Sequence, residues 1–233
     1  MAQVRRAPRR GYPVGVLLLA IDTSTSAITV ALHDGSRVLA EATTLDARAH
    51  GERLAPGIQE VLTRAGAQAA DLSHIVCGLG PGPFTGLRVG IVSARVMSLV
   101  TGASLHGMCS LDALAAAGPD GEVLVATDAR RKEVYWARYA VSPGAVRPLS
   151  EPAVSRPAEL PESVRALPTL GRGPMLYPAL FPAGLDVLDV SAAALATLAV
   201  HRLAAGDPLD AREPLYLRRP DAAPHVVAKS ALG

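Results

Sequence analysis

Apolar residues follow one another without interruption at residues 16–21, the pattern of a central strand that is covered on both faces. A polar turn at residues 22–26 comes next, and beyond it apolar side chains alternate with small or polar ones over residues 28–32. A second turn at residues 33–36 leads into another mainly apolar stretch at residues 38–42. Because strands joined by short turns usually pair with each other, this part of the chain predicts a meander of three strands.

Helical spacing replaces this alternation in the next segment. Its apolar positions recur at intervals of three and four residues before Gly66, a residue typical of helix ends, and they are Leu54, Ile58, Val61, Leu62 and Ala65. Residues 74–79 then have the pattern of a second buried strand, and residues 84–101 that of a long helix. This order of elements predicts a mixed α/β lobe.

The opening pattern returns in the second half of the chain. Residues 18–32 align with residues 124–138 at an offset of 106, which places Asp22 on Asp128. The following strand aligns at an offset of 110, and the change of four residues falls in a Ser-Pro-Gly turn, where a change of length costs little. Such internal repetition predicts a duplicated α/β fold with two lobes.

The domain boundaries follow from this repeat. We expect the first lobe at residues 15–118 and the second at residues 119–233. The second lobe is expected to be reduced, since prolines crowd its middle, its clearest helix covers residues 191–204, and its C-terminal tail is loose. Residues 1–14 are expected to form a basic extension of low order.

Composition narrows the classes of function. The chain has 233 residues, of which 49% are hydrophobic and only eight are aromatic (one Trp, five Tyr and two Phe). Four arginines precede the first acidic residue, and subtracting their charges from the net +2 leaves −2 for the rest: Arg5, Arg6, Arg9 and Arg10. A folded part with a net charge of −2 and few aromatic residues is not expected to have a broad basic surface or a set of stacked aromatic rings that would bind nucleic acid.

The two cysteines and the hydropathy pattern bear on location. Cys77 and Cys109 lie in apolar or glycine-flanked segments, without the spacing of a metal or redox motif, which favours a reduced, cytoplasmic compartment. No stretch of the sequence approaches the roughly 18–20 consecutive apolar residues that a membrane span needs. We therefore expect a cytoplasmic protein without a membrane segment.

Residues typical of catalysis do not form a recognisable set. None of the six histidines lies three or four residues from another, so a metal site on a helix is not expected. There is no Gly-x-Ser-x-Gly motif. The two lysines, Lys132 and Lys229, are not in apolar surroundings that would lower their pKa for nucleophilic chemistry.

Each lobe opens with a strand that ends in an aspartate. Two-lobed kinases hold nucleotide phosphates and metal ions at such turns, which makes Asp22, Thr23 and Asp128 candidates for a vestigial nucleotide cleft. Neither turn contains the glycines that let backbone N–H groups close around a phosphate. We therefore favour turns whose side chains bond to their own backbone.

A glycine- and proline-rich segment, residues 80–88, joins the second buried strand to the long helix. Pro81 and Pro83 lack the N–H groups that an anion-binding loop would use, which favours a stiff connection over a phosphate loop. Within the helix, small residues recur every fourth position, at Gly86, Gly90, Ala94 and Ser98. Such a face lets another backbone approach closely, and that neighbour could belong to another polypeptide or to the same fold.

Five motifs in this order closely resemble those of the TsaB family, also called YeaZ. They are residues 19–25 (Leu-Ala-Ile-Asp-Thr-Ser-Thr), residues 50–56 (His-x-Glu-x-Leu-x-Pro), residues 80–88 (Gly-Pro-Gly-x-Phe-Thr-Gly-Leu-Arg), residues 128–135 (Asp-Ala-Arg-x-x-Glu-Val-Tyr) and residues 214–218 (Pro-x-Tyr-Leu-Arg). The resemblance runs from about residue 16 to residue 219. Two departures stand out, because Gly51 and Pro83 replace residues that often carry a hydroxyl in the family.

This resemblance implies an actin-like/hexokinase-like ATPase (ASKHA) fold that lacks catalysis of its own. It implies a subunit needed to make threonylcarbamoyladenosine in tRNA, next to the anticodon. The partners implied are the catalytic subunit TsaD, the P-loop ATPase TsaE, and a second copy of the chain when it is alone. The resemblance also implies that TsaC supplies the activated intermediate and that the chain contacts tRNA only through the complex. No cofactor of its own is expected, since ATP or ADP would be bound by the partner subunit.

The same resemblance implies a docking surface on two helices of the first lobe, at about residues 52–65 and 84–101. The interface residues expected from it are Leu54, Ile58, Val61, Leu62, Gly86, Gly90, Ile91, Ala94 and Met97. Two other interpretations stay open. One is an autonomous kinase-like enzyme that uses Asp22 and Asp128, and the other is a peptidase.

Overall fold

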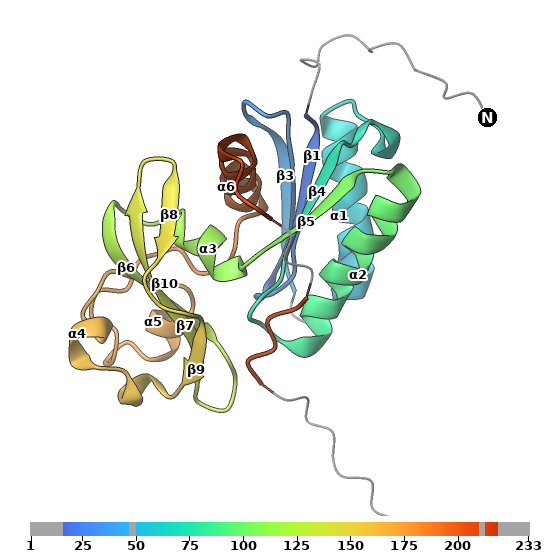
Figure 1. The fold of residues 1–233 in the computed structure, drawn as a ribbon. Coiled ribbons are helices and arrows are strands. Elements are labelled where there is room, and N and C mark those ends of the chain that lie inside the picture. The colour runs from blue at the N-terminus through green and yellow to red at the C-terminus, as the bar shows by residue number, and fades with distance from the viewer. Residues whose placement is uncertain (1–15, 47–49, 210–212, 219–233) are drawn as a thin grey trace, which may run out of the picture.

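The structure is a computed structural model and describes residues 16–46, 50–209 and 213–218. The basic extension expected at residues 1–14 and the end of the loose tail therefore lie outside the described residues. Two sheets stand side by side, with helices between them and on their outer faces (Figure 1).

The first sheet has the strand order β3-β2-β1-β4-β5. Strands β1, β2 and β3 form the expected antiparallel meander, while β4 and β5 add to it in parallel. The bounds are β1 Leu18–Asp22, β2 Ala27–His33, β3 Val38–Leu45, β4 His74–Gly78 and β5 Ser104–Met108. Helices α1 (His50–Arg64) and α2 (Phe84–Thr101) cover one face of this sheet, and a short 3₁₀ helix, Ala69–Asp71, precedes β4.

The second sheet also has five strands and repeats this topology except that it lacks a counterpart of β5. Its order is β10-β6-β7-β8, with β9 pairing on β7, so that β6, β7, β8 and β10 correspond to β1, β2, β3 and β4. The bounds are β6 Gly121–Asp128, β7 Val134–Ser142, β8 Ala145–Pro148, β9 Ala153–Ser155 and β10 Thr169–Leu170. Short helices replace the long outer ones of the first lobe: the 3₁₀ helix Pro157–Glu159, α4 Glu162–Arg165 and α5 Gly173–Leu176. The expected reduction of the second lobe is confirmed.

The register corrects one detail of the predicted repeat. Asp22 pairs with Thr29, whereas Asp128 pairs with Val134. Six residues separate the paired residues Asp22 and Thr29, whereas five separate Asp128 and Val134. A single offset of 106 does not hold across both strands of the hairpin, although the correspondence of the strands does.

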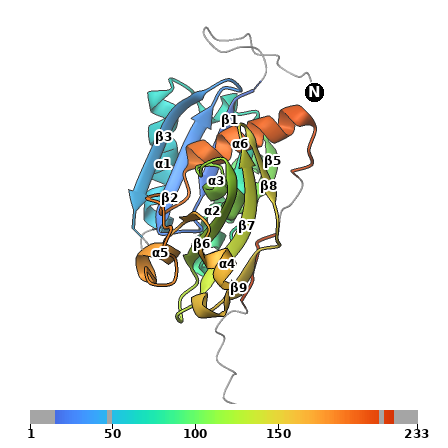
Figure 2. The same cartoon turned by 90° about the vertical axis from the view of Figure 1, so that its left-hand side faces the viewer.

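The last helix of each lobe packs on the sheet of the other lobe. Helix α3 (Ser110–Ala115) follows the first sheet in the chain but contacts β6 and β7, and α6 (Ala192–Ala205) follows the second sheet but lies on β1, β2 and β3 (Figure 2). Glu41 of β3 accepts hydrogen bonds from Ser191 Oγ (2.8 Å) and Ala193 N (3.0 Å) at the start of α6, where a carboxylate also favours the helix dipole. The lobes consequently share one buried core, to which Leu18 and Val125 both belong.

Candidate functional site

The carboxylate of Asp22, the first candidate for the cleft, is fully buried. One oxygen accepts hydrogen bonds from Ser24 N (2.8 Å) and Ser24 Oγ (2.7 Å), and the other accepts one from Ser110 Oγ (2.5 Å) at the start of α3. The space beside it is filled, because a Cβ on Gly78 would lie 1.8 Å from Asp22 Oδ2. Asp22 therefore joins β1 to α3, and the favoured interpretation of a turn that bonds to its own backbone is confirmed here.

Thr23 links the same turn to the small-residue face of α2. Its hydroxyl donates to the carbonyl oxygen of Gly86 (2.7 Å) and accepts from the backbone N–H of Gly90 (3.2 Å). A Cβ on Gly90 would lie 2.4 Å from Thr23 Oγ1, which no real side chain tolerates without movement. The neighbour that needs the room is thus the chain's own first turn, which decides the alternative left open by the sequence.

This packing corrects the expected interface residues. Eight of the nine are buried within the first lobe, and Met97 packs against the same core: Leu54, Ile58, Val61, Leu62, Gly86, Gly90, Ile91, Ala94 and Met97. Side chains enclosed in this way present no surface to another polypeptide. The spacing of small residues identified a close approach between backbones, but that approach is internal.

The opposite face of α2 is apolar and exposed. Its large hydrophobic side chains have exposed fractions of 55%, 52%, 85% and 81% and lie on one stripe of the helix: Val92, Val96, Leu99 and Val100. Arg88 and Arg95 flank this stripe. We call these four apolar residues the outer face of α2. The sequence carries a signal for it, since helical spacing places these aliphatic residues away from the small residues of the same helix.

By length and composition alone, α2 is also the one helix in the described residues that could cross a membrane, with 18 residues and a mean hydropathy of 1.3. Its inner face is held on the first sheet by Thr23. Arg88 and Arg95 would be costly to place in a bilayer. These contacts favour a helix that covers a sheet over a helix that crosses a membrane.

The second turn differs from the first. The side chain of Asp128 is 24% exposed, pairs with Arg130 (3.1 Å), and accepts a hydrogen bond from Arg130 N (2.7 Å). Three successive residues then adopt a left-handed backbone, Arg130, Arg131 and Lys132, with φ values of 61°, 52° and 63°. Residues other than glycine rarely do so, and each such residue costs about 1–2 kcal/mol.

The cleft between the two turns is small. Its cavity measures about 60 Å³ and is lined by Asp128 together with residues 24–26, whereas Asp22 and Thr23 are buried and do not line it. Arg172 and Asp189 also line it and form a two-point ion pair at 2.6 and 2.9 Å, which raises the pKa of Arg172. Pockets that hold small ligands typically measure about 300–1,000 Å³, so this cleft does not enclose a nucleotide in the conformation described.

Groups capable of nucleophilic or metal chemistry are scattered. Burial raises the pKa of Cys77 and raises that of Cys109 to about 12, which keeps both thiols protonated and unreactive. Within residues 16–46, 50–209 and 213–218, no three side chains of His, Cys, Asp or Glu lie close enough to hold a metal ion.

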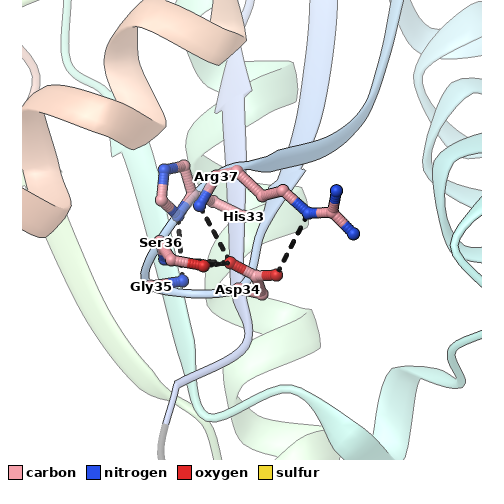
Figure 3. Close-up of polar contacts among 5 residues, drawn as sticks. All are labelled: His33, Asp34, Gly35, Ser36 and Arg37. Atoms are coloured by element: carbon pink, nitrogen blue, oxygen red, sulfur yellow. Dashed lines mark hydrogen bonds and ion pairs between the residues drawn. The ribbon is translucent and has the colours of Figure 1, made fainter. Parts of the chain in front are cut away.

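One titratable cluster, in the turn between β2 and β3, serves the turn itself (Figure 3). Burial would raise the pKa of Asp34, but hydrogen bonds from Ser36 and Arg37 hold it below its usual value. His33 Nδ1 accepts a hydrogen bond from Gly35 N (2.9 Å), and burial lowers the pKa of His33. The contacts of this cluster shape the hairpin.

Comparison with known proteins completes the description. The family model for TsaD, tRNA N6-adenosine threonylcarbamoyltransferase, matches residues 37–226. The Escherichia coli tRNA threonylcarbamoyladenosine biosynthesis protein TsaB is 34% identical, in an alignment covering 86% of this chain and 94% of that protein. The chain belongs to the TsaB/YeaZ family.

Two further proteins are similar to this chain over most of its length. An uncharacterized protein of Mycobacterium tuberculosis is 43% identical over 90% of this chain and 95% of its own length. The structure of YeaZ from Pseudomonas aeruginosa superposes with a TM-score of 0.76, at 29% identity over 87% of this chain and all of that one. The predicted family and the two-lobe α/β fold are thereby confirmed.

Proposed function

We propose that this chain is a subunit of the machinery that forms threonylcarbamoyladenosine in tRNA, and that it docks a catalytic TsaD-type subunit without performing catalysis itself. The observation that carries the proposal is the outer face of α2, whose four large apolar side chains are more than half exposed. Contiguous exposed apolar residues of this kind typically mark a protein interface.

The comparisons support the pathway in this proposal. The relative from Escherichia coli is named for threonylcarbamoyladenosine biosynthesis, and the matching family model describes the threonylcarbamoyltransferase itself. This chain thus shares a fold family with the enzyme we propose as its partner. Two related folds that each expose a helix face can pair through those faces, as the subunits of a pseudosymmetric dimer do.

The chemistry of the described residues supports the non-catalytic part. Asp22 is engaged in the core, the cleft between the two turns is small, and the two thiols are held in their unreactive form. In our proposal the nucleotide and metal chemistry belong to the TsaD-type partner, TsaE joins the complex, and a second copy of the chain covers α2 when no partner is present. The site of action is the cytoplasm.

The test uses the chain and the TsaD-type subunit of the same organism, produced together. Leu99→Asp and Val96→Asp place a charge on the outer face of α2 without touching the core, so each should fold normally and lose co-purification with the partner. Met175→Asp is the matched control, since Met175 is similarly exposed (51%) on α5 of the second lobe.

Modification of tRNA gives the second readout, measured as threonylcarbamoyladenosine in hydrolysed tRNA from cells that depend on each variant. We expect the two α2 variants to lose most of the modified nucleoside and Met175→Asp to keep it. Normal assembly and modification with Leu99→Asp and Val96→Asp would contradict the proposal.

A further inference from the structure

A second cavity, of about 160 Å³, opens where three segments that are distant in the sequence meet. They are the loop that leads into α2, the turn after β6, and the C-terminal segment at residues 214–218 (Figure 1, the segment in red beside α2). The residues that give it its chemistry are Phe84, Arg130, Arg131, Tyr135, Tyr216 and Arg218. We call this cavity the junction pocket.

The junction pocket concentrates aromatic side chains in a chain that has few. Three of the eight aromatic residues of the sequence line it, although composition alone disfavoured a stacking surface. Phe84 and Tyr216 pack with ring centroids 4.9 Å apart, and the guanidinium of Arg88 lies 3.7 Å from the centre of the Phe84 ring. Tyr216 is 40% exposed, so its ring is available to a further planar group.

The charge of the junction pocket has one sign. Among the described residues, the charged side chains that line it are Arg130, Arg131 and Arg218, and none of these lining residues carries a carboxylate. Arg130 and Arg218 form ion pairs just outside the pocket, with Asp128 and Glu133. Each guanidinium has five N–H donors, so one such ion pair leaves further donors for an anion.

The backbone of the turn supplies an independent indication. Arg130, Arg131 and Lys132 all have a positive φ, which costs stability in residues other than glycine, yet none of the three is a glycine, which would adopt this backbone freely. Strained backbone of this kind concentrates at sites that bind ligands. Here it holds two arginines at the rim of an aromatic pocket.

From these observations we infer that the junction pocket binds one nucleotide of an RNA strand, with the phosphate on Arg130 and Arg131 and the base against Tyr216. Arginine is suited to phosphate, and stacking on aromatic rings is the usual way that proteins hold unpaired bases. The junction pocket is smaller than the roughly 300–1,000 Å³ of sites that enclose a small ligand, so it would hold the nucleotide only in part and leave the rest of the strand outside.

This inference rests on the proposed function, since the RNA meant is the tRNA that the complex modifies. It extends that function, because it gives this subunit a direct contact with the substrate. Phe84 begins α2, so the junction pocket lies at one end of the helix whose outer face we propose as the docking surface. An RNA bound by the partner could therefore reach both subunits.

The test measures tRNA binding to the complex of the full chain with its TsaD-type partner. In the double variant Arg130→Asn, Arg131→Asn, asparagine tolerates the left-handed backbone, so the turn is retained. We expect its affinity for tRNA to fall about fivefold or more, with a salt dependence shallower by about 0.7 for each phosphate that the variant no longer neutralises. Tyr216→Leu keeps an apolar side chain and should weaken binding about fivefold, because the base can no longer stack on an aromatic ring.

Arg147→Asn is the matched control, because Arg147 is an exposed arginine on β8, away from the junction pocket, and should leave binding unchanged. Photo-crosslinking of tRNA that contains 4-thiouridine gives a second readout, with attachment expected at Tyr216, Phe84 or Tyr135. Unchanged affinity in both variants, together with crosslinks only elsewhere on the chain, would overturn the inference.

Two further outcomes have separate meanings. If AMP displaces tRNA from the junction pocket at a concentration close to that of the tRNA itself, the ligand is a free nucleotide and the assignment to RNA is wrong. Co-purification with the partner is recorded for every variant, so a failure of the unaltered chain to assemble would count against the proposed function. Intact assembly with unchanged RNA binding would count against this inference alone.

Discussion

The two lobes carry the same strand order but use the turn after their first strand in opposite ways. In the first lobe, Asp22 is buried, accepts hydrogen bonds from Ser24 and Ser110, and lies beside a threonine that holds α2. In the second lobe, Asp128 is partly exposed, and the residues after it are basic and strained. A duplicated topology has therefore kept its framework while one turn became part of the core and the other became a surface.

The helices on the outer side of each sheet also differ between the lobes. Two long helices cover the first sheet, and the outer face of α2 is apolar and exposed, whereas the second lobe has only short helices outside its sheet. The first lobe is thus equipped for a large apolar contact with a protein. The second lobe contributes the arginines of the junction pocket, which it shares with the start of α2, whereas the proposed protein contact lies on the first lobe alone.

The largest effect on stability is expected from Gly90→Ala in the first lobe. The new Cβ would overlap Thr23 Oγ1, so the variant should lose about 1–3 kcal/mol of its free energy of unfolding, as overpacked cores do. Gly57→Ala in α1 is the matched control, because its Cβ meets only ordinary contact with Val30 at 3.7 Å. That variant should gain about 0.5–1 kcal/mol from helix propensity. Equal stability of the two variants in urea unfolding would show that the small-residue face of α2 is not packed as described.

A smaller difference is expected between the two aspartates. Asp22→Asn replaces a buried acceptor oxygen by an amide that cannot accept from Ser110, and should cost about 1–3 kcal/mol. Asp128→Asn keeps the hydrogen bond from Arg130 N and loses only an exposed ion pair, which costs less than about 1 kcal/mol. Reversal of this order in thermal unfolding would contradict the assignment of one turn to the core and the other to the surface.

The smallest effect concerns pH and the hairpin between β2 and β3. Burial lowers the pKa of His33 below 6.5, with Asp34 acting in the opposite direction and His201 in the same direction. The unfolded chain then binds more protons than the folded one just below pH 6.5, so stability should fall as the pH drops through that value. His33→Asn retains an acceptor for Gly35 N and should flatten this part of the curve. His74, whose pKa burial also lowers, accounts for the remainder. An unchanged pH profile in His33→Asn would show that His33 is not the titrating group.

The sequence predicted the framework of the fold because its signals are local. Unbroken apolar runs, alternation and helical spacing located β1, β2, β4 and α2, and the repeat predicted the second lobe. Strand β5 was not predicted, since its five residues, from Ser104 to Met108, neither alternate nor form an apolar run. The exchange of α3 and α6 between the lobes depends on contacts between distant segments, which periodicity does not record.

The candidate sites were harder to predict for the same reason. The spacing of Gly86 and Gly90 showed that a backbone comes close, but the partner is Thr23, more than sixty residues earlier in the chain. The sequence shows that Val92, Val96 and Leu99 share one side of α2, but only their exposed fractions in the structure show that this side faces solvent. The junction pocket was out of reach, because Phe84, Arg130 and Tyr216 belong to three separate motifs that only the fold brings together.

The measurement that tests the central claim most directly is thiol labelling of α2 with and without the TsaD-type partner. Val96→Cys introduces a thiol on the outer face, and the native thiols of Cys77 and Cys109 stay silent because burial keeps them protonated. With the chain dilute enough to be monomeric, the new thiol should react rapidly with a maleimide and become protected when the partner is added. Met175→Cys should react at the same rate in both states. Protection at Met175→Cys with none at Val96→Cys would place the partner on the second lobe and contradict the account.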